Sequence, residues 1–255
     1  MNNRWQRWCV GLVIVLGACV NEPDPEGHHN STDVAEVKSA NSWRTHMYVT
    51  PLLHAVATLH EARVAQLLAE GAKPDDPAAA RSPLVQAITS FDGKKLFCHE
   101  AMVRLLLNHG ADPNRPDPTI RVKPLQEALG MGDVSCATVL YKAGASLQNS
   151  DQQLTVMMAA TQGAIRTNSF TIIDLVLSWG VDANLAGSSG WTALHEAAAS
   201  NRGTEALVRY LLDRGVNPCS TSRGMTPQRL AILGRRPQGL IDALSTDPLC
   251  RGGSP

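Results

Sequence analysis

The residues that most invite a catalytic interpretation are three His-Glu pairs, which a zinc protease would carry on a helix as H-E-x-x-H. The pairs are His60-Glu61, His99-Glu100 and His195-Glu196. The second histidine is missing in each case, because the position four residues after the first is valine or alanine. No G-x-S-x-G, P-loop or G-x-G-x-x-G motif occurs in a supporting context. The sequence therefore predicts no enzyme, no catalytic residue and no cofactor.

A second candidate for chemistry is the adjacent pair His28-His29, which could hold a metal ion. It lies in a polar stretch, residues 21–45, that contains Pro23, Pro25 and Gly27. Such a composition is typical of a flexible tether. Two adjacent histidines in a tether are more often solvated than bound to metal. We therefore expect no metal site.

Composition restricts the class of protein further. The chain has 255 residues, of which 44% are hydrophobic but only 4% are aromatic. A core of alanine, leucine and valine with few rings suits small, closely stacked helices. Lysine plus arginine equals aspartate plus glutamate at 23 each, so charge gives no argument for a nucleic-acid partner.

The N-terminus has the pattern of an export signal. Arg4 and Arg7 precede an apolar run, Trp8 to Val20, that is shorter than the ~20 residues of a membrane-spanning helix. The run includes Leu16-Gly17-Ala18-Cys19, which resembles the lipobox of bacterial lipoproteins. The resemblance implies that residues 1–18 are removed and that Cys19 is acylated. The alternative is an ordinary signal peptide in which Cys19 is incidental.

Acyl chains on Cys19 would anchor the protein, and stable anchoring takes more than one chain. Residues 19–45 would then be the lipidated cysteine and its tether. Val20 follows the cysteine where lipoproteins kept at the inner membrane usually have aspartate, so the resemblance favours the outer membrane. We expect a bacterial envelope protein that faces the periplasm.

The rest of the chain is organised around residues 190–218, GWTALHEAAASNRGTEALVRYLLDRGVNP. Thr192 is a predicted N-cap for a short alanine-rich helix, and Gly215 is placed to end a second helix. The second helix has apolar residues at helical spacing: Leu207, Val208, Leu211 and Leu212. One such pair cannot bury its apolar faces alone, so it predicts neighbours of the same kind.

The pattern recurs in units that start near residues 50, 82, 123, 155, 192 and 226. The units open on Thr50-Pro51, Ser82-Pro83, Lys123-Pro124, Leu154, Thr192 and Thr226-Pro227. They resemble ankyrin repeats, whose signature is T-P-L-H-x-A over about 33 residues. The resemblance implies an all-α solenoid of about six helix-turn-helix repeats over residues 46–246. Loops like β-hairpins would join the repeats, and residues 247–255 would form a tail.

Some positions depart from the family pattern. Leu53, Val85 and Gln126 replace the signature histidine, and only His195 keeps it. In the family this histidine makes structural hydrogen bonds between repeats, which is the role the resemblance implies for His195.

Other departures concern helix starts and lengths. Lys123 and Leu154 replace the capping hydroxyl, so the third and fourth units are expected to be less stable. Extra residues lengthen the second unit near Phe91–Cys98, the fourth near Gly163–Asn168 and, slightly, the fifth. These insertions are predicted to lie between the two helices of a unit and to project from one side.

Four cysteines remain once Cys9 and Cys19 are set aside: Cys98, Cys136, Cys219 and Cys250. An even count in an exported chain indicates disulfides. The repeat positions favour Cys98–Cys136, in adjacent repeats, and Cys219–Cys250, which would tie down the tail. The alternative is four free thiols. No C-x-x-C motif supports a zinc site.

Proteins similar to this one bind other proteins on the concave surface of the solenoid. By repeat position, the candidate partner-binding residues are His54, Arg81, Gln86, Arg121, Glu127, Trp191 and Glu196. Trp191 is the best single anchor because tryptophan is enriched in binding hot spots. The alternatives are that Trp191 packs on its own repeat and that the others are solvated.

Two functions stay open. The first is an envelope binding module, in its sharpest form an immunity protein that binds and neutralises a toxin delivered into the periplasm. The second is a structural or stress-related adaptor that holds a resident envelope protein. The partner is a protein in both cases, and the membrane is reached through the N-terminal lipid.

Overall fold

The computed structural model describes residues 49–148 and 154–245. The predicted signal peptide, the tether, the tail, Cys19 and Cys250 lie outside the described residues. The described helices come in consecutive pairs. The first helices of the pairs are α2 (Pro51–Ala57), α4 (Pro83–Ile88), α6 (Pro124–Met131), α8 (Val156–Thr167), α10 (Ala193–Ala199) and α12 (Pro227–Leu233). The second helices are α3 (Glu61–Ala69), α5 (Glu100–Asn108), α7 (Val134–Lys142), α9 (Thr171–Ser178), α11 (Glu205–Asp213) and α13 (Gln238–Ser245).

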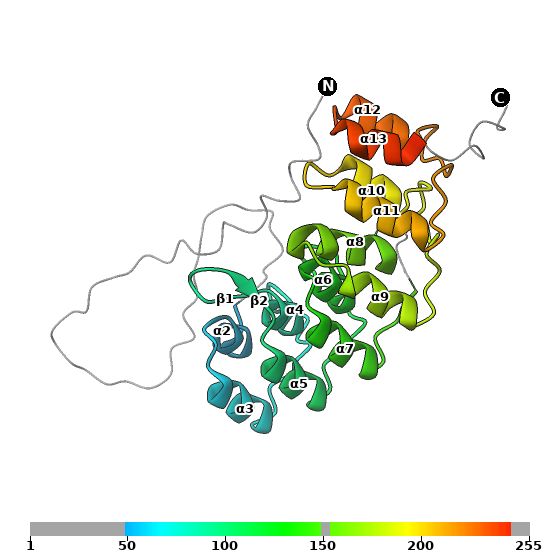
Figure 1. Ribbon diagram of the computed structural model, residues 1–255. Coiled ribbons are helices and arrows are strands. Elements are labelled where there is room, and N and C mark those ends of the chain that lie inside the picture. Colours follow the sequence, from blue (N-terminus) through cyan, green and yellow to red (C-terminus); the bar gives the residue numbers. More distant parts are fainter. Residues whose placement is uncertain (1–48, 149–153, 246–255) are drawn as a thin grey trace, which may run out of the picture. The chain divides into compact units, whose positions relative to one another are not determined.

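The first helices pack against one another in chain order from α2 to α12, and each also packs on its own second helix (Figure 1). The second helices form a parallel outer row, in which α3 contacts α5 and α5 contacts α7. Each pair thus covers one apolar face of the next pair. One hydrophobic core therefore runs through the described part of the chain, from Leu52 to Leu244.

Short hydroxyl side chains start most of the first helices. Thr50 Oγ1 accepts a hydrogen bond from Leu53 N at 3.2 Å, and prolines at the next position supply the helical φ angle. The expectation that the fourth unit lacks such a cap is wrong. Thr155, one residue beyond Leu154, caps α8 by accepting a hydrogen bond from Met158 N at 3.1 Å.

The N-cap of α6 does lack a hydroxyl. There Lys123 N donates instead to Oε1 of Gln126 at 3.2 Å, so a side chain from inside the helix satisfies the backbone of the cap residue.

Glycine ends the second helices, as Gly215 illustrates. Gly215 follows α11 with a φ of +79°, a left-handed conformation that costs glycine little. Its N–H bonds to Leu212 O at 2.9 Å and turns the chain toward the next pair.

The two larger insertions take different forms. Residues after α4 form an antiparallel hairpin of β1 (Ser90–Phe91) and β2 (Leu96–Phe97), which pairs Ser90 with Phe97. The insertion near Gly163–Asn168 was expected between the helices, but α8 continues as helix through Thr167. A helix is possible there because Gly163 lets α8 approach α6 closely: a Cβ at Gly163 would stand 2.0 Å from Leu129 O.

Within the described residues, none of the helices combines the length and the apolar character needed to cross a bilayer.

Candidate functional site

Six side chains occupy the same position, the fourth residue, of the six first helices. We call them the first-helix row: His54, Gln86, Glu127, Ala159, Glu196 and Leu230. Four of the predicted partner-binding residues belong to it. The row crosses all the described pairs, because the first helices pack in chain order.

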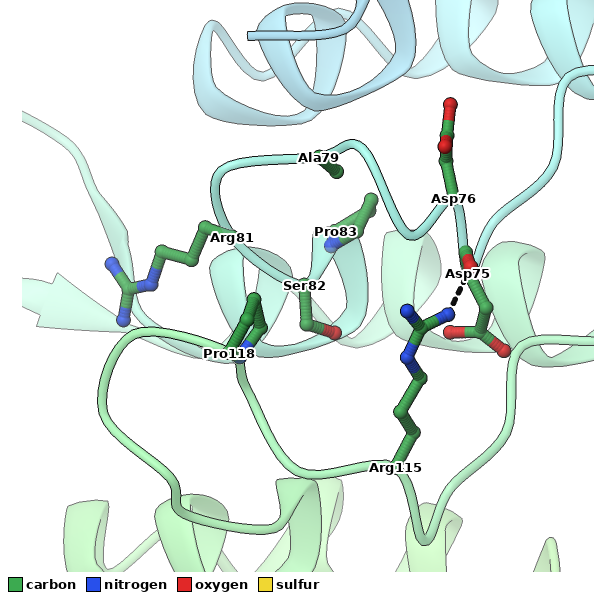
Figure 2. A pocket seen from close by; sticks show the side chains of 8 residues that line it. All are labelled: Asp75, Asp76, Ala79, Arg81, Ser82, Pro83, Arg115 and Pro118. Carbon is green, nitrogen blue, oxygen red and sulfur yellow. Dashed lines mark hydrogen bonds between the residues drawn. The ribbon is translucent and has the colours of Figure 1, made fainter. Parts of the chain in front are cut away.

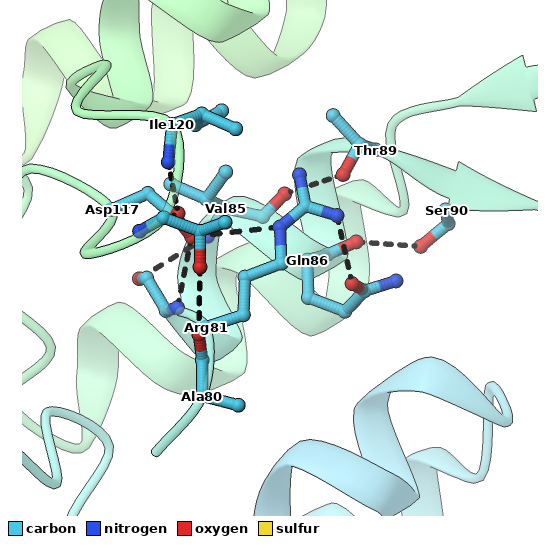
Figure 3. Close-up of polar contacts among 10 residues, drawn as sticks. Ala80, Arg81, Val85, Gln86, Thr89, Ser90, Asp117 and Ile120 are labelled. Carbon is cyan, nitrogen blue, oxygen red and sulfur yellow. Dashed lines mark hydrogen bonds and ion pairs between the residues drawn. The ribbon is translucent and has the colours of Figure 1, made fainter. Parts of the chain in front are cut away.

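Gln86, the member of the row on α4, is hydrogen-bonded to the loop that precedes this helix (Figure 3). Arg81 Nη1 donates to Gln86 Oε1 at 3.2 Å, and Arg81 Nε lies 3.5 Å from Asp117 Oδ2. Asp117 is fully buried, and its carboxylate also accepts backbone N–H groups from Ser82 at 3.0 Å and from Thr119 at 2.8 Å. Arg81 is therefore held in one orientation beside the row. Asp117 escaped the sequence analysis because a D-P-T sequence reads as an ordinary turn.

Glu127 is the least satisfied member of the row. Its side chain is half-buried, and within residues 49–148 and 154–245 its carboxylate has no hydrogen bond or ion pair. Burial raises the pKa of the Glu127 carboxyl, while the charges of Arg81 and Arg166 oppose the rise. A desolvated carboxylate with two arginines nearby but no direct partner gains energy from a donor that a bound protein supplies.

Glu196 is held more firmly than Glu127. Gln162 Nε2 donates to its Oε1 at 3.1 Å, and Trp191 Nε1 donates to its Oε2 at 3.1 Å. Burial raises the pKa of the Glu196 carboxyl, and these two hydrogen bonds counteract the rise. Gln162 was missed by the sequence analysis, because spacing does not reveal that a side chain one turn after Ala159 on α8 reaches Glu196 in the next repeat.

Trp191 lies against its own repeat, as one of the two interpretations expected. Its ring centroid is 5.3 Å from that of His195, and its side chain is half-buried. The exposed remainder borders Glu196. Of the other predicted residues, His54 is exposed on α2, and Arg121 is exposed in a loop with a φ of +60°.

His195 has the structural position that the resemblance implies. Its Nδ1 contacts Thr192 N and Oγ1 at 3.2 and 2.8 Å, and its Nε2 lies 3.1 Å from Met225 O in the following pair. Burial lowers the pKa of His195. Both ring nitrogens are occupied, so the ring is not placed to act as a base. Gln126 has the same bridging role in α6, where its Nε2 donates to Leu154 O.

The remaining His-Glu pairs are also engaged in structural contacts. His60 Nδ1 lies 2.9 Å from Thr58 Oγ1 in the turn before α3. His99 Nε2 lies 3.2 Å from Glu61 Oε1, so a histidine of the second pair contacts a glutamate of the first. The Thr58 hydroxyl also donates to the carbonyl of His54 at 2.8 Å, so the His60 contact belongs to the turn that follows α2.

Two cysteines of neighbouring repeats form the predicted disulfide. Cys98 and Cys136 are bonded across a Cα–Cα distance of 6.4 Å, and they join the segment just before α5 to the first turn of α7. Asp133 has an oxygen within 4.8 Å of both sulfurs, but sulfurs in a disulfide are not thiolate ligands for a metal. Cys219 is disulfide-bonded as well, while Cys250, its predicted partner, lies outside the described residues.

One small cavity lies between the loops that precede α4 and α6 (Figure 2). Arg115 closes it by donating through Nη1 to the carbonyl of Asp75. Its volume of about 10 Å³ is enough for about one water molecule. The hydrogen bond from Arg115 links the two loops beside the cavity. The cavity itself is too small for a cofactor.

The sequence matches family models for ankyrin repeats. Residues 162–244 match the model described as "Ankyrin repeats (3 copies)", and residues 81–118 match the model described as "Ankyrin repeat". Human cyclin-dependent kinase 4 inhibitor B is 31% identical over 103 residues, which are 40% of this chain and 70% of the inhibitor. Zygote-specific protein 3 of Chlamydomonas reinhardtii is 32% identical over 136 residues, which are 53% of this chain and 32% of that protein.

The chain spans from a tenth to about half of the length of the first curated relatives it matches. Among solved structures, a predatory endopeptidase from Bdellovibrio bacteriovorus in complex with an immunity protein contains a similar chain. The match has a TM-score of 0.62 and 22% identity, and it covers 78% of this chain and 100% of the other. These findings confirm the predicted fold class.

Proposed function

Because the chain belongs to the ankyrin-repeat family, we propose that it is a lipid-anchored binding module of the bacterial envelope that captures and neutralises a protein toxin delivered into the periplasm. Ankyrin repeats mediate protein–protein binding. The single observation that carries the proposal is that four members of the first-helix row are polar and that two of them, Glu127 and Glu196, are half-buried carboxylates.

The row has the properties of a preorganised binding surface. Arg81, Gln86 and Glu196 are already fixed by hydrogen bonds or an ion pair to their neighbours, so little side-chain entropy is lost when a partner docks. Glu127 offers a carboxylate that is half-buried and whose pKa burial raises. A lysine or arginine of the partner would therefore gain a charge-assisted hydrogen bond there.

The structural neighbour supports the immunity interpretation. Its description names an immunity protein in complex with an endopeptidase. The cyclin-dependent kinase inhibitors among the relatives also carry the name of inhibitors of other proteins. We propose inhibition by binding for the present chain: it binds the toxin and blocks access to it, and it catalyses no reaction itself.

The periplasmic part of the proposal rests on cysteine chemistry. The Cys98–Cys136 disulfide suits an oxidising compartment such as the periplasm. The lipobox-like Leu16-Gly17-Ala18-Cys19 would supply the anchor on the outer membrane. Radiolabelled palmitate tests this anchor, because it should label the chain and fail to label a Cys19→Ser variant.

The experiment that tests the function uses the full chain with a C-terminal tag, extracted from the envelope in mild detergent. It is mixed with the secreted proteins of related strains, and any bound protein is identified and assayed for toxicity in the periplasm. We expect one stoichiometric partner, protection of cells that produce the chain, and at least tenfold weaker binding by Glu127→Lys.

Glu100→Lys is the matched control, because Glu100 lies on the outer helix α5 in an exposed pair with Arg104. It should bind like the wild type. Capture of resident envelope proteins without protection would instead favour the structural or stress-related adaptor. Equal loss of binding in both variants would place the partner elsewhere and overturn the role of the first-helix row.

A further inference from the structure

The hairpin of β1 and β2 is a feature that the first-helix row does not explain. It connects α4 to α5, and within residues 49–148 and 154–245 it forms the one two-stranded sheet. In Figure 1 it leaves the end of α4 and projects away from α5 and α7. An insertion that served packing alone would lie against the core.

The turn of the hairpin is rigid. Asp92 Oδ1 accepts the backbone N–H groups of Lys94 and Lys95, both at 2.9 Å, and Gly93 has the φ of +87° that the turn requires. These hydrogen bonds hold the pKa of Asp92 below its ordinary value, so the carboxylate stays ionised and keeps the turn at neutral pH. The backbone positions of Lys94 and Lys95 are thereby fixed.

The base of the hairpin is fixed as well. Ser90 is only 1% exposed, and its Oγ donates to Ala87 O at 3.0 Å. His99 N donates to the same carbonyl at 2.9 Å. Cys98, directly after β2, is covalently bonded to Cys136 on α7. A hairpin held at both ends docks with little loss of conformational entropy.

The hairpin exposes one aromatic ring and two cationic side chains. Phe91 is one of three phenylalanines in the chain, and 44% of it is exposed to solvent. Lys94 and Lys95 in the same hairpin are exposed, and Asp92 is the single acidic residue there. An exposed aromatic ring next to cations fits a partner that offers an apolar pocket with carboxylates at its rim.

The hairpin is continuous with the first-helix row. Ser90 Oγ lies 3.4 Å from the carbonyl of Gln86, and Gln86 is the row member that Arg81 holds (Figure 3). A protein bound over Gln86 therefore has the hairpin at its edge. A membrane surface is a poorer match, since two lysines contribute only about 1 kcal/mol each at an anionic bilayer.

We propose that the hairpin of residues 90–97 is a docking arm that enters an acidic cleft of the protein bound on the first-helix row, with Phe91 in an apolar pocket and Lys94 and Lys95 on carboxylates. This inference rests on the proposed function and names the chemistry of its partner. The arm would supply specificity, because a partner without an acidic cleft would meet unpaired lysines.

Photo-cross-linking tests the arm in cells that produce the full chain and are mixed with the medium of related strains. A benzophenone amino acid is placed at position 91, at position 86 of the first-helix row or, as a control, at position 209 on the outer helix α11. We expect positions 86 and 91 to label the same protein and position 209 to label none. The peptide labelled from position 91 should contain aspartate or glutamate.

A charge-reversal variant separates the arm from the row. Lys94→Glu/Lys95→Glu should reduce labelling from position 91 at least tenfold, whereas Lys142→Glu on α7 should not. Labelling from position 86 alone would overturn the arm and leave the proposed function standing. Labelling from neither position would overturn both. A lipid adduct at position 91, or labelling that survives the charge reversal, would also overturn the arm.

Discussion

Gln162 of α8 donates a hydrogen bond of 3.1 Å to the carboxylate of Glu196 on α10, so one repeat orients a binding residue of the next. Gln162 lies on α8 one turn after Ala159 of the first-helix row, and from there its side chain reaches the next first helix. The same carboxylate receives the indole N–H of Trp191. The orientation of Glu196, a predicted partner-binding residue, therefore depends on Gln162, for which no partner contact was predicted.

We predict that Gln162→Ala raises the pKa of Glu196 above its wild-type value, because the hydrogen bond from Gln162 lowers that pKa against the effect of burial. Carbon-detected NMR titration of the glutamate carboxyls measures the change directly. Gln66→Ala is the control, since Gln66 on α3 bonds to the exposed Glu70 just after that helix and is remote in sequence from Glu196. An unchanged Glu196 titration would show that Gln162 does not position the carboxylate.

The repeat around residues 190–218 was predictable because local signals and packing agree there. α10 begins directly after Thr192, and Gly215 adopts the left-handed conformation just beyond α11. Leu207 and Leu211 are buried at helical spacing, as the periodicity indicates. In this stretch each residue type has one structural role, so the pattern can be recognised without a structure.

The contacts between repeats could not be predicted in the same way. Gln126 substitutes for a histidine because its amide can accept from Lys123 N and donate to Leu154 O, a geometry that spacing does not reveal. The Thr155 cap was missed because the sequence comparison aligned Leu154, one residue earlier, with the other caps. The hairpin could have been found, since an Asp-Gly turn between aromatic residues is a hairpin signal.

His195 supports a prediction about the junction between the last two pairs. His195→Ala removes the contacts to Thr192 and Met225 O and leaves buried polar groups without partners. We expect the free energy of unfolding to fall by about 2–3 kcal/mol. His195→Gln is the matched control, because Gln126 makes the equivalent bridge in α6. It should cost less than half as much in urea unfolding.

The same residue predicts a pH dependence. Burial lowers the folded-state pKa of His195 below its ordinary value of 6.5, so the unfolded chain binds the proton more readily. The stabilisation is complete above about pH 6.5 and declines as the pH falls toward the lowered pKa. His195→Gln should flatten the stability profile in this range. A profile with the same slope in both proteins would contradict the assignment.

The close approach of α6 and α8 predicts opposite outcomes for two glycines. A Cβ at Gly163 would stand 2.0 Å from the backbone oxygen of Leu129, so Gly163→Ala must push the two helices apart. We expect a loss of at least about 2 kcal/mol in the free energy of unfolding. A Cβ at Gly130 on α6 would meet its nearest atom at 3.7 Å, so Gly130→Ala should stabilise by about 0.5–1 kcal/mol.

Thermal unfolding followed by circular dichroism compares these variants. Both substitutions add one methyl group to a helix of the same interface, so their difference isolates the steric contact. Two variants of equal stability would mean that the interface yields to the extra methyl group.

The Cys98–Cys136 disulfide closes a loop with a sequence separation of 38 residues between two neighbouring repeats. We predict that Cys98→Ala/Cys136→Ala lowers the free energy of unfolding by about 3–4 kcal/mol, mainly because the unfolded chain regains the freedom of that loop. Alanine is chosen because Cys136 is fully buried and a serine hydroxyl would lack a partner. Substitution is preferable to a reductant, which would also attack the disulfide of Cys219.

Urea unfolding measured separately at the two ends of the chain gives the sharpest test, because a repeat array unfolds through contacts between neighbours. Amide hydrogen exchange of α11 and α13 reports the C-terminal pairs, and amide hydrogen exchange of α4 and α5 reports the region of the disulfide. The double variant should lose protection around α4 and α5 first, while a Cys219→Ala variant should leave that region unchanged. Equal protection of α4 and α5 in the double variant and the wild type would show that the disulfide contributes no stability to this part of the array.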